Sequence, residues 1–308
     1  MRVVVIANPR AGRGRARRLL AQFERAAERL GEDLELHWSA GPGHASEIAR
    51  ACAARADVVC VAGGDGTVHE VVNGLMPHPP PITVLPVGTG NDFARMFGFA
   101  RTPDDLLRVV RAGEGARLDV IECGGRYAVN GVGIGFEALV TRESRSIRGP
   151  GGMLLYLAAV FKALARYDCP PLHIEVDGHE TIAGERLLVS LGNGPTTGGG
   201  FRLNPDAHPD DGYLDACIVA GMGRARVLRL LPAATRGAHV GRDGVVMRRC
   251  REIAVSGARA FHLHLDGEYV GEQAEKLRFR VIERALPVLF AGDRPARLSR
   301  PRERIRAG

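Results

Sequence analysis

The sequence predicts an α/β domain with a parallel sheet, followed by a β-sandwich domain. In the first third of the chain, apolar strand-like runs alternate with helical segments, which is typical of parallel strands joined by crossover helices. After about residue 121 the chain changes to short β-rich runs broken by Asp-Gly and Gly pairs, which indicate hairpins of a sandwich or barrel. The length of 308 residues is long for one core and suits two domains.

The α/β domain is expected to span residues 1–124, with the boundary near 122–128. Its strands are predicted at 2–8, 34–39, 57–62 and 81–87. Its helices are predicted at 14–30, at 44–54 and from residue 67 onward. Because each strand is followed by a helix, the strands are expected to run parallel.

The sandwich domain is expected to span residues 125–290. Its strands are predicted at 173–178, 186–194, 213–220, 252–257, 261–270 and 277–283, with helices near 136–145, 152–166 and 223–236. The tail, residues 291–308, lacks hydrophobic periodicity and holds six arginines against Asp293 and Glu303. We expect a solvated basic arm, or a segment that returns to the first domain.

Three turn-rich segments follow strands of the predicted parallel sheet: NPRAGRG (8–14), GGDGT (63–67) and GTGND (88–92). The carboxyl ends of parallel strands form one crevice, so these loops are expected to converge. Consecutive glycines before a helix let backbone N–H groups approach an anion closely, which makes a phosphate cradle. The carboxylate of Asp65 fits such a cradle if Mg²⁺ lies beside it or if it handles a proton. The alternative is a tight turn with Asp65 as a helix cap.

The net charge of +7 and the isoelectric point near 9.4 favour an anionic partner, and only Lys162 and Lys276 are lysines. Nucleic acid, an acidic membrane surface and a phosphorylated small molecule are all candidates on charge alone. The longest apolar run, from Met153, is too short to span a bilayer, and no signal peptide precedes the first strand. We expect a cytoplasmic protein that contacts the anionic inner face of the membrane peripherally.

The motifs NPRAG, GGDGTVHEVVNGL, LPVGTGNDFAR, PDAHPDDGYLDACIV and LDGE, in this order, resemble the bacterial members of the diacylglycerol kinase and sphingosine kinase superfamily. The resemblance covers nearly the whole chain. It implies an NAD kinase-like nucleotide-binding domain followed by a β-sandwich, which agrees with the layout above. Gly-Gly-Asp-Gly is shared with NAD kinases and phosphofructokinases, whereas the GTGNDFA segment is much more specific to lipid kinases.

The resemblance implies an ATP site and two metal sites. The implied ATP-binding residues are Asn8, Pro9, Arg10, Ala11, Gly12, Ser39, Gly63, Gly64, Asp65, Gly66, Thr67, Val68, His69, Gly88, Thr89, Asn91 and Asp92. Many relatives carry Thr where this chain has Ser39, which retains the hydroxyl. The acids implied for the nucleotide Mg²⁺ are Asp65, Asp92 and Asp119. His208, Asp211 and Tyr213 match a structural Mg²⁺ loop, for which the alternative is a plain Asp-Gly turn.

The segment HLHLDGEYV, residues 262–270, is implied to carry the general base. The resemblance assigns this catalytic role to Glu268, with Asp266 beside it and Asp65 in the phosphate loop. The alternative is a solvent-exposed Asp-Gly turn. His262 and His264 lie on one strand face, which favours packing over metal binding.

These observations predict a lipid kinase that transfers phosphate from ATP, with Mg²⁺, to a lipid hydroxyl group. Diacylglycerol is the first candidate substrate, with ceramide or a sphingoid base within the same class. One alternative is a soluble-substrate kinase of the NAD kinase type. The other is a nucleotide-binding regulator without turnover, which the presence of Asp65, Asp92 and Glu268 disfavours. No nucleic-acid partner is expected, and the sequence leaves a homodimer open.

Overall fold

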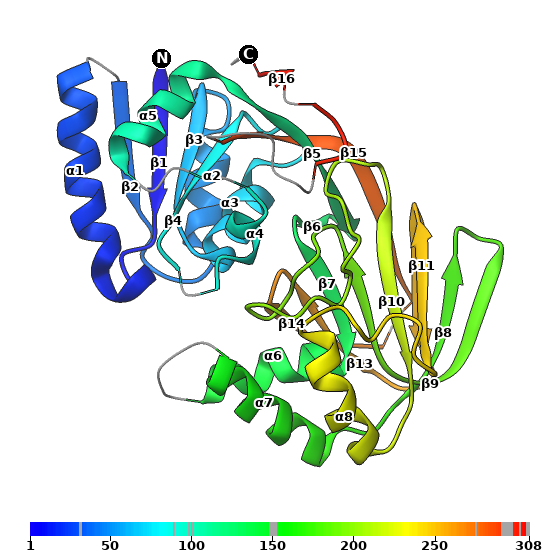
Figure 1. Ribbon diagram of the computed structural model, residues 1–308. Coiled ribbons are helices and arrows are strands. Elements are labelled where there is room, and N and C mark those ends of the chain that lie inside the picture. The colour runs from blue at the N-terminus through cyan, green and yellow to red at the C-terminus, as the bar shows by residue number, and fades with distance from the viewer. Residues whose placement is uncertain are drawn as a thin grey trace. The chain divides into compact units, whose positions relative to one another are not determined.

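The computed structural model describes most of the chain: residues 1–30, 33–88, 90–97, 99, 102–147, 153–274, 276–290, 298–301 and 303–305. The chain forms two compact units (Figure 1). The first unit comprises Met1–Asp119 and Glu283–Gly308, and the second comprises Val120–Ile282. The C-terminal segment therefore belongs with the N-terminal unit.

The first unit is built on a parallel sheet. Its strands β1 (Arg2–Ala7), β2 (Asp33–Trp38), β3 (Val58–Gly63) and β4 (Ile82–Pro86) lie in the order β4-β3-β1-β2. β3 is buried at every residue, and β1 from its second residue on. Strands with two buried faces read as continuous apolar runs, which explains why VVVIA and VVCVA identified them in the sequence.

Helices cover both faces of this sheet. Alternate residues of β1 and β3 pack against α1 (Arg15–Leu30) and α5 (Pro103–Ala112) in one apolar cluster. The intervening residues point to the other face, and α2 (His44–Cys52) and α3 (Asp65–Leu75) pack together closely. A Cβ at Gly74 in α3 would lie 2.2 Å from the carbonyl oxygen of Ser46 in α2. The short elements η1 (Ala11–Gly14) and α4 (Asp92–Arg95) follow β1 and β4.

The C-terminal end of the chain adds strands to the first unit. The end of β15 (Leu277–Leu289) lies parallel to β4, with Val288 opposite Ile82. β16 (Glu303–Arg304) pairs antiparallel with β5 (Glu114–Cys123), and the N–H of Ile305 donates to the carbonyl oxygen of Gly113 at 2.7 Å. Ile305 is buried in the same cluster as α1 and α5. Residues 303–305 of the tail are therefore structural parts of the unit, not a solvated arm.

The second unit has two antiparallel sheets that share one long strand. One sheet has the order β14-β13-β7-β9-β10-β11, and the other has the order β9-β8-β12-β15. The strands are β6 (Arg126–Ala128), β7 (Gly131–Gly135), β8 (Pro171–Val176), β9 (Glu180–Gly192), β10 (Leu214–Ala220), β11 (Val245–Cys250), β12 (Glu252–Gly257), β13 (Phe261–Leu265) and β14 (Glu268–Gln273). One apolar cluster lies between the sheets and includes Ile174, Leu191, Leu214, Leu263 and Phe279. This is the sandwich that the hairpin pattern predicts.

Three helices form a layer on the second unit (Figure 1). They are α6 (Phe136–Ser146), α7 (Met153–Arg166) and α8 (Arg224–Ala234), and they share an apolar cluster with β9 and β10. All three were predicted within two residues at each end. In the described part of the chain, no helix combines the length and hydropathy needed to cross a bilayer.

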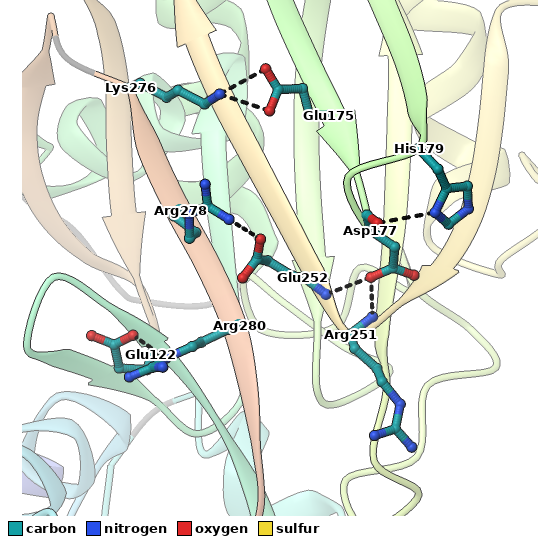
Figure 2. Close-up of polar contacts among 9 residues, drawn as sticks. All are labelled: Glu122, Glu175, Asp177, His179, Arg251, Glu252, Lys276, Arg278 and Arg280. Carbon is teal, nitrogen blue, oxygen red and sulfur yellow. Dashed lines mark hydrogen bonds and ion pairs between the residues drawn. The ribbon is translucent and has the colours of Figure 1, made fainter.

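Paired charges lie along the sheet that contains β8, β12 and β15, as Figure 2 shows. Lys276 binds Glu175 at 2.7 Å, Arg280 binds Glu122 at 2.8 Å, and Arg278 pairs with Glu252. Such exposed pairs each stabilise a fold by about 0–1 kcal/mol. Their main consequence is that this part of the sheet is unsuited to an apolar ligand.

Candidate active site

The loop after β1 meets the loop after β3 at the carboxyl edge of the parallel sheet. The backbone N–H of Asn8 donates to the carbonyl oxygen of Ala62 at 3.0 Å, and Asn8 Nδ2 lies 3.4 Å from Thr67 Oγ1. Ser39 follows β2 at the same edge, where its N–H donates to the carbonyl oxygen of Ala7 at 2.8 Å. The structure thus brings the first two predicted loops and Ser39 to one edge.

The turn at residues 8–12 is organised around the Asn8 side chain. Asn8 Oδ1 accepts the N–H of Arg10 at 2.9 Å, and the carbonyl oxygen of Asn8 accepts the N–H of Ala11 at 3.1 Å. Gly12 has φ +59°, a conformation that glycine adopts without strain. Pro9 lies within this turn.

The loop after β4 packs directly on the loop after β3. The N–H groups of Val87 and Gly88 both donate to the carbonyl oxygen of Gly63, at 3.0 and 3.3 Å. A Cβ at Gly88 would lie 2.4 Å from the Cα of Gly64, and a Cβ at Gly63 would lie 2.4 Å from the Cβ of Thr67. The glycines therefore permit a backbone approach that no larger residue allows, as a phosphate cradle requires.

Asp65 connects these two loops. It is the first residue of α3, and its Oδ1 accepts the backbone N–H of Phe93 at 3.1 Å. Its Oδ2 would lie 2.9 Å from a Cβ at Gly90. Gly64, not Asp65, is the residue before α3, so Asp65 does not cap that helix, and its bond to Phe93 instead satisfies an N–H group in the first turn of α4. Gly66, Val68 and His69 follow it within α3.

Asn91 and Asp92 begin the short helix α4. Asn91 has φ +52°, and its Nδ2 donates to the carbonyl oxygen of Gly88 at 2.8 Å. Its Oδ1 is buried and has no hydrogen-bond partner among the residues that the structure describes. Asp92 is buried as well. Thr89, between them and β4, lies outside the described residues.

The carboxylates of this edge fit a cation that is also bound by phosphate oxygens. Asp65 and Asp92 lie within or beside glycine turns, and oxygen ligands of this type suit Mg²⁺. Within the described ranges, no group of three or more His, Cys, Asp or Glu side chains comes close enough to hold a metal. A cation here would therefore need phosphate or water oxygens to complete its coordination.

Asp119 has a different environment. It is fully buried in β5, and its Oδ1 accepts the backbone N–H of Arg284 at 2.7 Å. Arg284 has φ +53°, and its guanidinium binds both oxygens of Glu303 at 2.9 Å. Asp119 thus stabilises the C-terminal strands, and the structure does not join it with Asp65 and Asp92 in a three-carboxylate group.

The loop at 208–213 in the second unit concentrates negative charge. Burial raises the pKa of Asp211, and burial together with the neighbouring Asp211 carboxylate raises the pKa of Asp215 to about 6. A cation bound beside these carboxylates would offset the cost of burying their charge. The Arg249 guanidinium already supplies one positive charge beside these carboxylates, because it pairs with Asp211. The same guanidinium lies 4.4 Å from the centre of the Tyr213 ring. His208 belongs to the same turn.

Asp266 and Glu268 differ sharply in their surroundings. The Asp266 carboxylate accepts three backbone N–H groups, from Val129, Asn130 and Gly131, at 2.8–3.0 Å. The Glu268 side chain is 42% exposed and pairs with Arg145 of α6. Asp266 therefore holds the hairpin turn in place, whereas Glu268 is accessible to a reacting hydroxyl.

An apolar cavity of about 50 Å³ lies within the helix layer of the second unit. Its walls come from α6, α7, α8, β9, β10 and the loop residues Phe201, Leu203 and His239, and the polar side chains among them are those of Glu137, Tyr156 and His239. This volume holds a few water molecules at most. A hydrocarbon chain would have to part the helices to enter.

Sequence analysis missed the partners of the predicted base. Arg145 pairs with Glu268 across 123 positions in the chain. His264 was interpreted as packing only, although its ring accepts the N–H of Gly267 at 3.2 Å. The Arg145–Glu268 contact has no local sequence pattern, because α6 and the turn before β14 are far apart along the chain, whereas the His264–Gly267 bond lies within one hairpin.

Comparison with known proteins agrees with an α/β domain followed by a β-sandwich domain. The model of the diacylglycerol kinase catalytic domain matches residues 2–123, and that of the YegS C-terminal NAD kinase β-sandwich-like domain matches residues 130–290. The diacylglycerol kinase of Bacillus subtilis (strain 168) is 32% identical over 277 residues, covering 88% of this chain and 90% of its own.

A second relative and a solved structure extend the comparison. The diacylglycerol kinase of Staphylococcus aureus (strain bovine RF122 / ET3-1) is 31% identical over 296 residues, covering 95% of this chain and 93% of its own. A crystal structure of a diacylglycerol kinase from Bacillus anthracis (strain Sterne) has the same fold, with a TM-score of 0.71 and 22% identity, over 96% of this chain and 98% of that one. On this similarity in sequence and fold, the chain belongs to the diacylglycerol kinase family.

Proposed function

We propose that the protein is an ATP- and Mg²⁺-dependent lipid kinase that transfers the γ-phosphate of ATP to the hydroxyl group of diacylglycerol. The observation that carries the proposal is the junction of loops 63–66 and 88–92 around Asp65. Phosphoryl transfer requires mainly positioning and neutralisation of charge, which glycine turns and helix N-termini provide. Curated relatives with the name diacylglycerol kinase support the choice of substrate.

The nucleotide is assigned to the first unit. Backbone N–H groups of Gly12 and residues 64–66 are proposed to bind its phosphates, since those of Asn8, Arg10, Ala11 and Thr67 already donate within the protein. Ser39 and the 88–92 loop lie beside them in this proposal. When bound there, Mg²⁺ would neutralise charge on the β- and γ-phosphates, and Asp65 and Asp92 would hold it. The loop with His208, Asp211 and Tyr213 is proposed as a separate, structural metal site.

Glu268 is assigned as the general base. Its carboxylate would take the proton of the lipid hydroxyl while that oxygen forms a bond to the γ-phosphorus and the bond to the ADP oxygen breaks. Asp266 cannot serve equally well, because three backbone N–H groups occupy its oxygens. Arg145 fixes the direction in which the Glu268 carboxylate points.

The helices α6, α7 and α8 are proposed to part so that the apolar cavity between them widens and binds the hydrocarbon part of the lipid. Val160 and Leu231 are among the side chains that form its walls. Burial of apolar surface stabilises such a complex by about 25 cal/mol per Å². A soluble nucleotide substrate such as NAD would gain nothing from this cavity.

Transfer of labelled phosphate from ATP tests the proposal directly. We expect phosphorylation of diacylglycerol in mixed micelles, and none of NAD in the absence of lipid. Ceramide and sphingosine, assayed in parallel, distinguish among lipid alcohols. Phosphorylation of NAD together with no transfer to any lipid would contradict the proposal of a lipid kinase.

A matched pair of variants locates the lipid within the same assay. Val160→Phe fills the cavity and is expected to raise KM for long-chain diacylglycerol about tenfold, with a smaller change for a short-chain analogue. Val240→Phe adds the same bulk at an exposed position and is expected to leave KM unchanged. Equal KM values for the two variants would place the lipid elsewhere.

The surface of α7 and α8 is proposed to contact an anionic membrane. The two helices contain no acidic residue and five basic residues, and Phe161 and Leu228 are exposed large apolar side chains. Basic residues near an anionic surface each contribute about 1 kcal/mol. Exposed apolar side chains add affinity when they enter the headgroup region.

Vesicle sedimentation tests this membrane surface. The double substitution of Phe161 and Leu228 by serine is expected to weaken binding to anionic vesicles about tenfold, because apolar area is no longer buried. Trp38→Ser removes an exposed aromatic side chain of the first unit and serves as the control. Unchanged binding by the double variant would contradict a role of α7 and α8.

Removal of the tail from residue 293 is expected to lower the melting temperature, because Ile305 and β16 are lost.

A further inference from the structure

His264 lies beneath the turn that carries Glu268. It is buried in β13, and its Nδ1 accepts the backbone N–H of Gly267 at 3.2 Å. Because Nδ1 accepts, the proton of the neutral ring is on Nε2. Nε2 lies 3.4 Å from Glu137 Oε1, a polar contact that falls short of a hydrogen bond, and it has no hydrogen-bond partner among the described residues. The ring therefore joins the turn to α6.

Glu137 is buried at the start of α6, and its surroundings fix its position. Its Oε1 accepts the hydroxyl of Thr197 at 2.8 Å, and the residue forms part of the wall of the apolar cavity. Its Oε2 is buried and has no hydrogen-bond partner among the described residues. A buried carboxylate in apolar surroundings destabilises a fold unless something compensates it. The presence of Glu137 there calls for a role.

Gly133 makes room for both side chains. A Cβ at this position of β7 would lie 2.2 Å from His264 Nε2 and 2.7 Å from the Glu137 carboxyl carbon. β7 is the direct neighbour of β13, with Gly133 opposite His264. The absence of a side chain at residue 133 thus allows the imidazole and the carboxylate to approach each other over the strand.

We propose that Glu137 and His264 are a positioning pair that holds the base-bearing turn and links it to the lipid cavity. The connection runs from Thr197 through Glu137 and His264 to the Gly267 N–H, next to Glu268. Arg145 holds the same turn from the other side, since it donates to the carbonyl oxygen of Gly267 at 3.3 Å. The inference rests on the proposed function of Glu268. A displacement of about 1 Å of a catalytic group can cost about a hundredfold in rate.

Two substitutions of His264 separate its hydrogen bond from its bulk. His264→Phe keeps the ring but removes the acceptor, so kcat is expected to fall about thirtyfold with KM for ATP unchanged. His264→Asn places an amide oxygen near the Nδ1 position, and kcat is expected to stay within about threefold of wild type. Hydrogen exchange of the Gly267 amide, measured on the same proteins, should be faster in His264→Phe and nearly normal in His264→Asn.

Two substitutions of Glu137 test the other half of the pair. Glu137→Gln retains an acceptor for the imidazole and is expected to keep kcat within about threefold. Glu137→Met removes it and is expected to lower kcat about tenfold. If Glu137→Gln is as slow as Glu137→Met, the negative charge matters rather than the position, and the proposal is overturned.

The exchange measurement separates this inference from the kinase assignment. If the wild-type protein has no lipid kinase activity, the proposed function is wrong. The hydrogen-exchange rate of the Gly267 amide would still show whether His264 holds the turn. Wild-type kcat in His264→Phe, or slow turnover in His264→Asn despite a protected Gly267 amide, would overturn the positioning role. Should His264→Phe not fold, Thr197→Val frees Glu137 from its anchor. This variant is expected to lower kcat about tenfold, as Glu137→Met does, and a kcat within about threefold of wild type would count against the pair.

Discussion

Replacing Glu268 by alanine is expected to lower kcat at least about a hundredfold, the usual effect of losing a general base, while ATP affinity stays near that of wild type. The side chain is partly exposed and pairs with Arg145, so the folded structure should tolerate the change. Single-turnover transfer of phosphate to diacylglycerol measures the chemical step, and a binding titration with ATP measures the affinity.

Asp266→Ala is the informative comparison. It removes the acceptor of three backbone N–H groups, and each unsatisfied buried donor costs about 1–3 kcal/mol. We therefore expect a lower melting temperature together with lower activity, whereas Glu268→Ala should melt like wild type. Full activity in Glu268→Ala with a stable but inactive Asp266→Ala would transfer the role of base to Asp266.

Replacing Asp65 by asparagine is expected to abolish Mg²⁺-dependent transfer without unfolding the protein. The amide oxygen can still accept the N–H of Phe93, so the junction of the two glycine loops is retained. The lost charge removes the attraction for a divalent cation. Comparison of ATP binding with and without Mg²⁺, together with a thermal melt, measures both effects.

Asp33→Asn is a matched control for this substitution. It removes one carboxylate charge from an exposed pair with Arg2, and such pairs contribute little to stability. Its activity and melting temperature should remain close to those of wild type. Normal Mg²⁺-dependent activity in Asp65→Asn, with an unchanged melt, would remove Asp65 from the mechanism.

Much of the architecture follows from local patterns in the chain. The buried parallel strands β1 and β3 appear as unbroken apolar runs because helices cover both faces, and the glycine loops appear directly after them. Helix α5 and strand β5 had no such signal and were not predicted. α5 begins with a Thr102 cap and Pro103, which in retrospect is a recognisable start of a helix.

The chemistry of individual carboxylates was harder to predict. Asp65, Asp119 and Asp266 all follow or interrupt apolar strands, so their local sequence does not distinguish the environments of the three carboxylates. In the structure Asp119 accepts the backbone N–H of Arg284, which is 165 positions away in the chain. Asp266 accepts backbone N–H groups that include that of Val129, which is 137 positions away. Such long-range hydrogen bonds have no local signature, because pairing between distant strands decides them.

Sequence alone was sufficient for the fold class, the meeting of the glycine loops at one edge of the parallel sheet and the family, because each depends on short segments whose spacing and residue types are sufficient evidence. Only the tertiary structure showed how the surroundings of Glu268 and Asp266 differ, decided between a solvated arm and a return to the first unit for residues 303–305, and brought Glu137, His264 and Gly133 together. The physical reason is that hydrogen bonds and burial are properties of atoms in contact, and in this protein the contacts that set the environment of each carboxylate join strands separated by many residues.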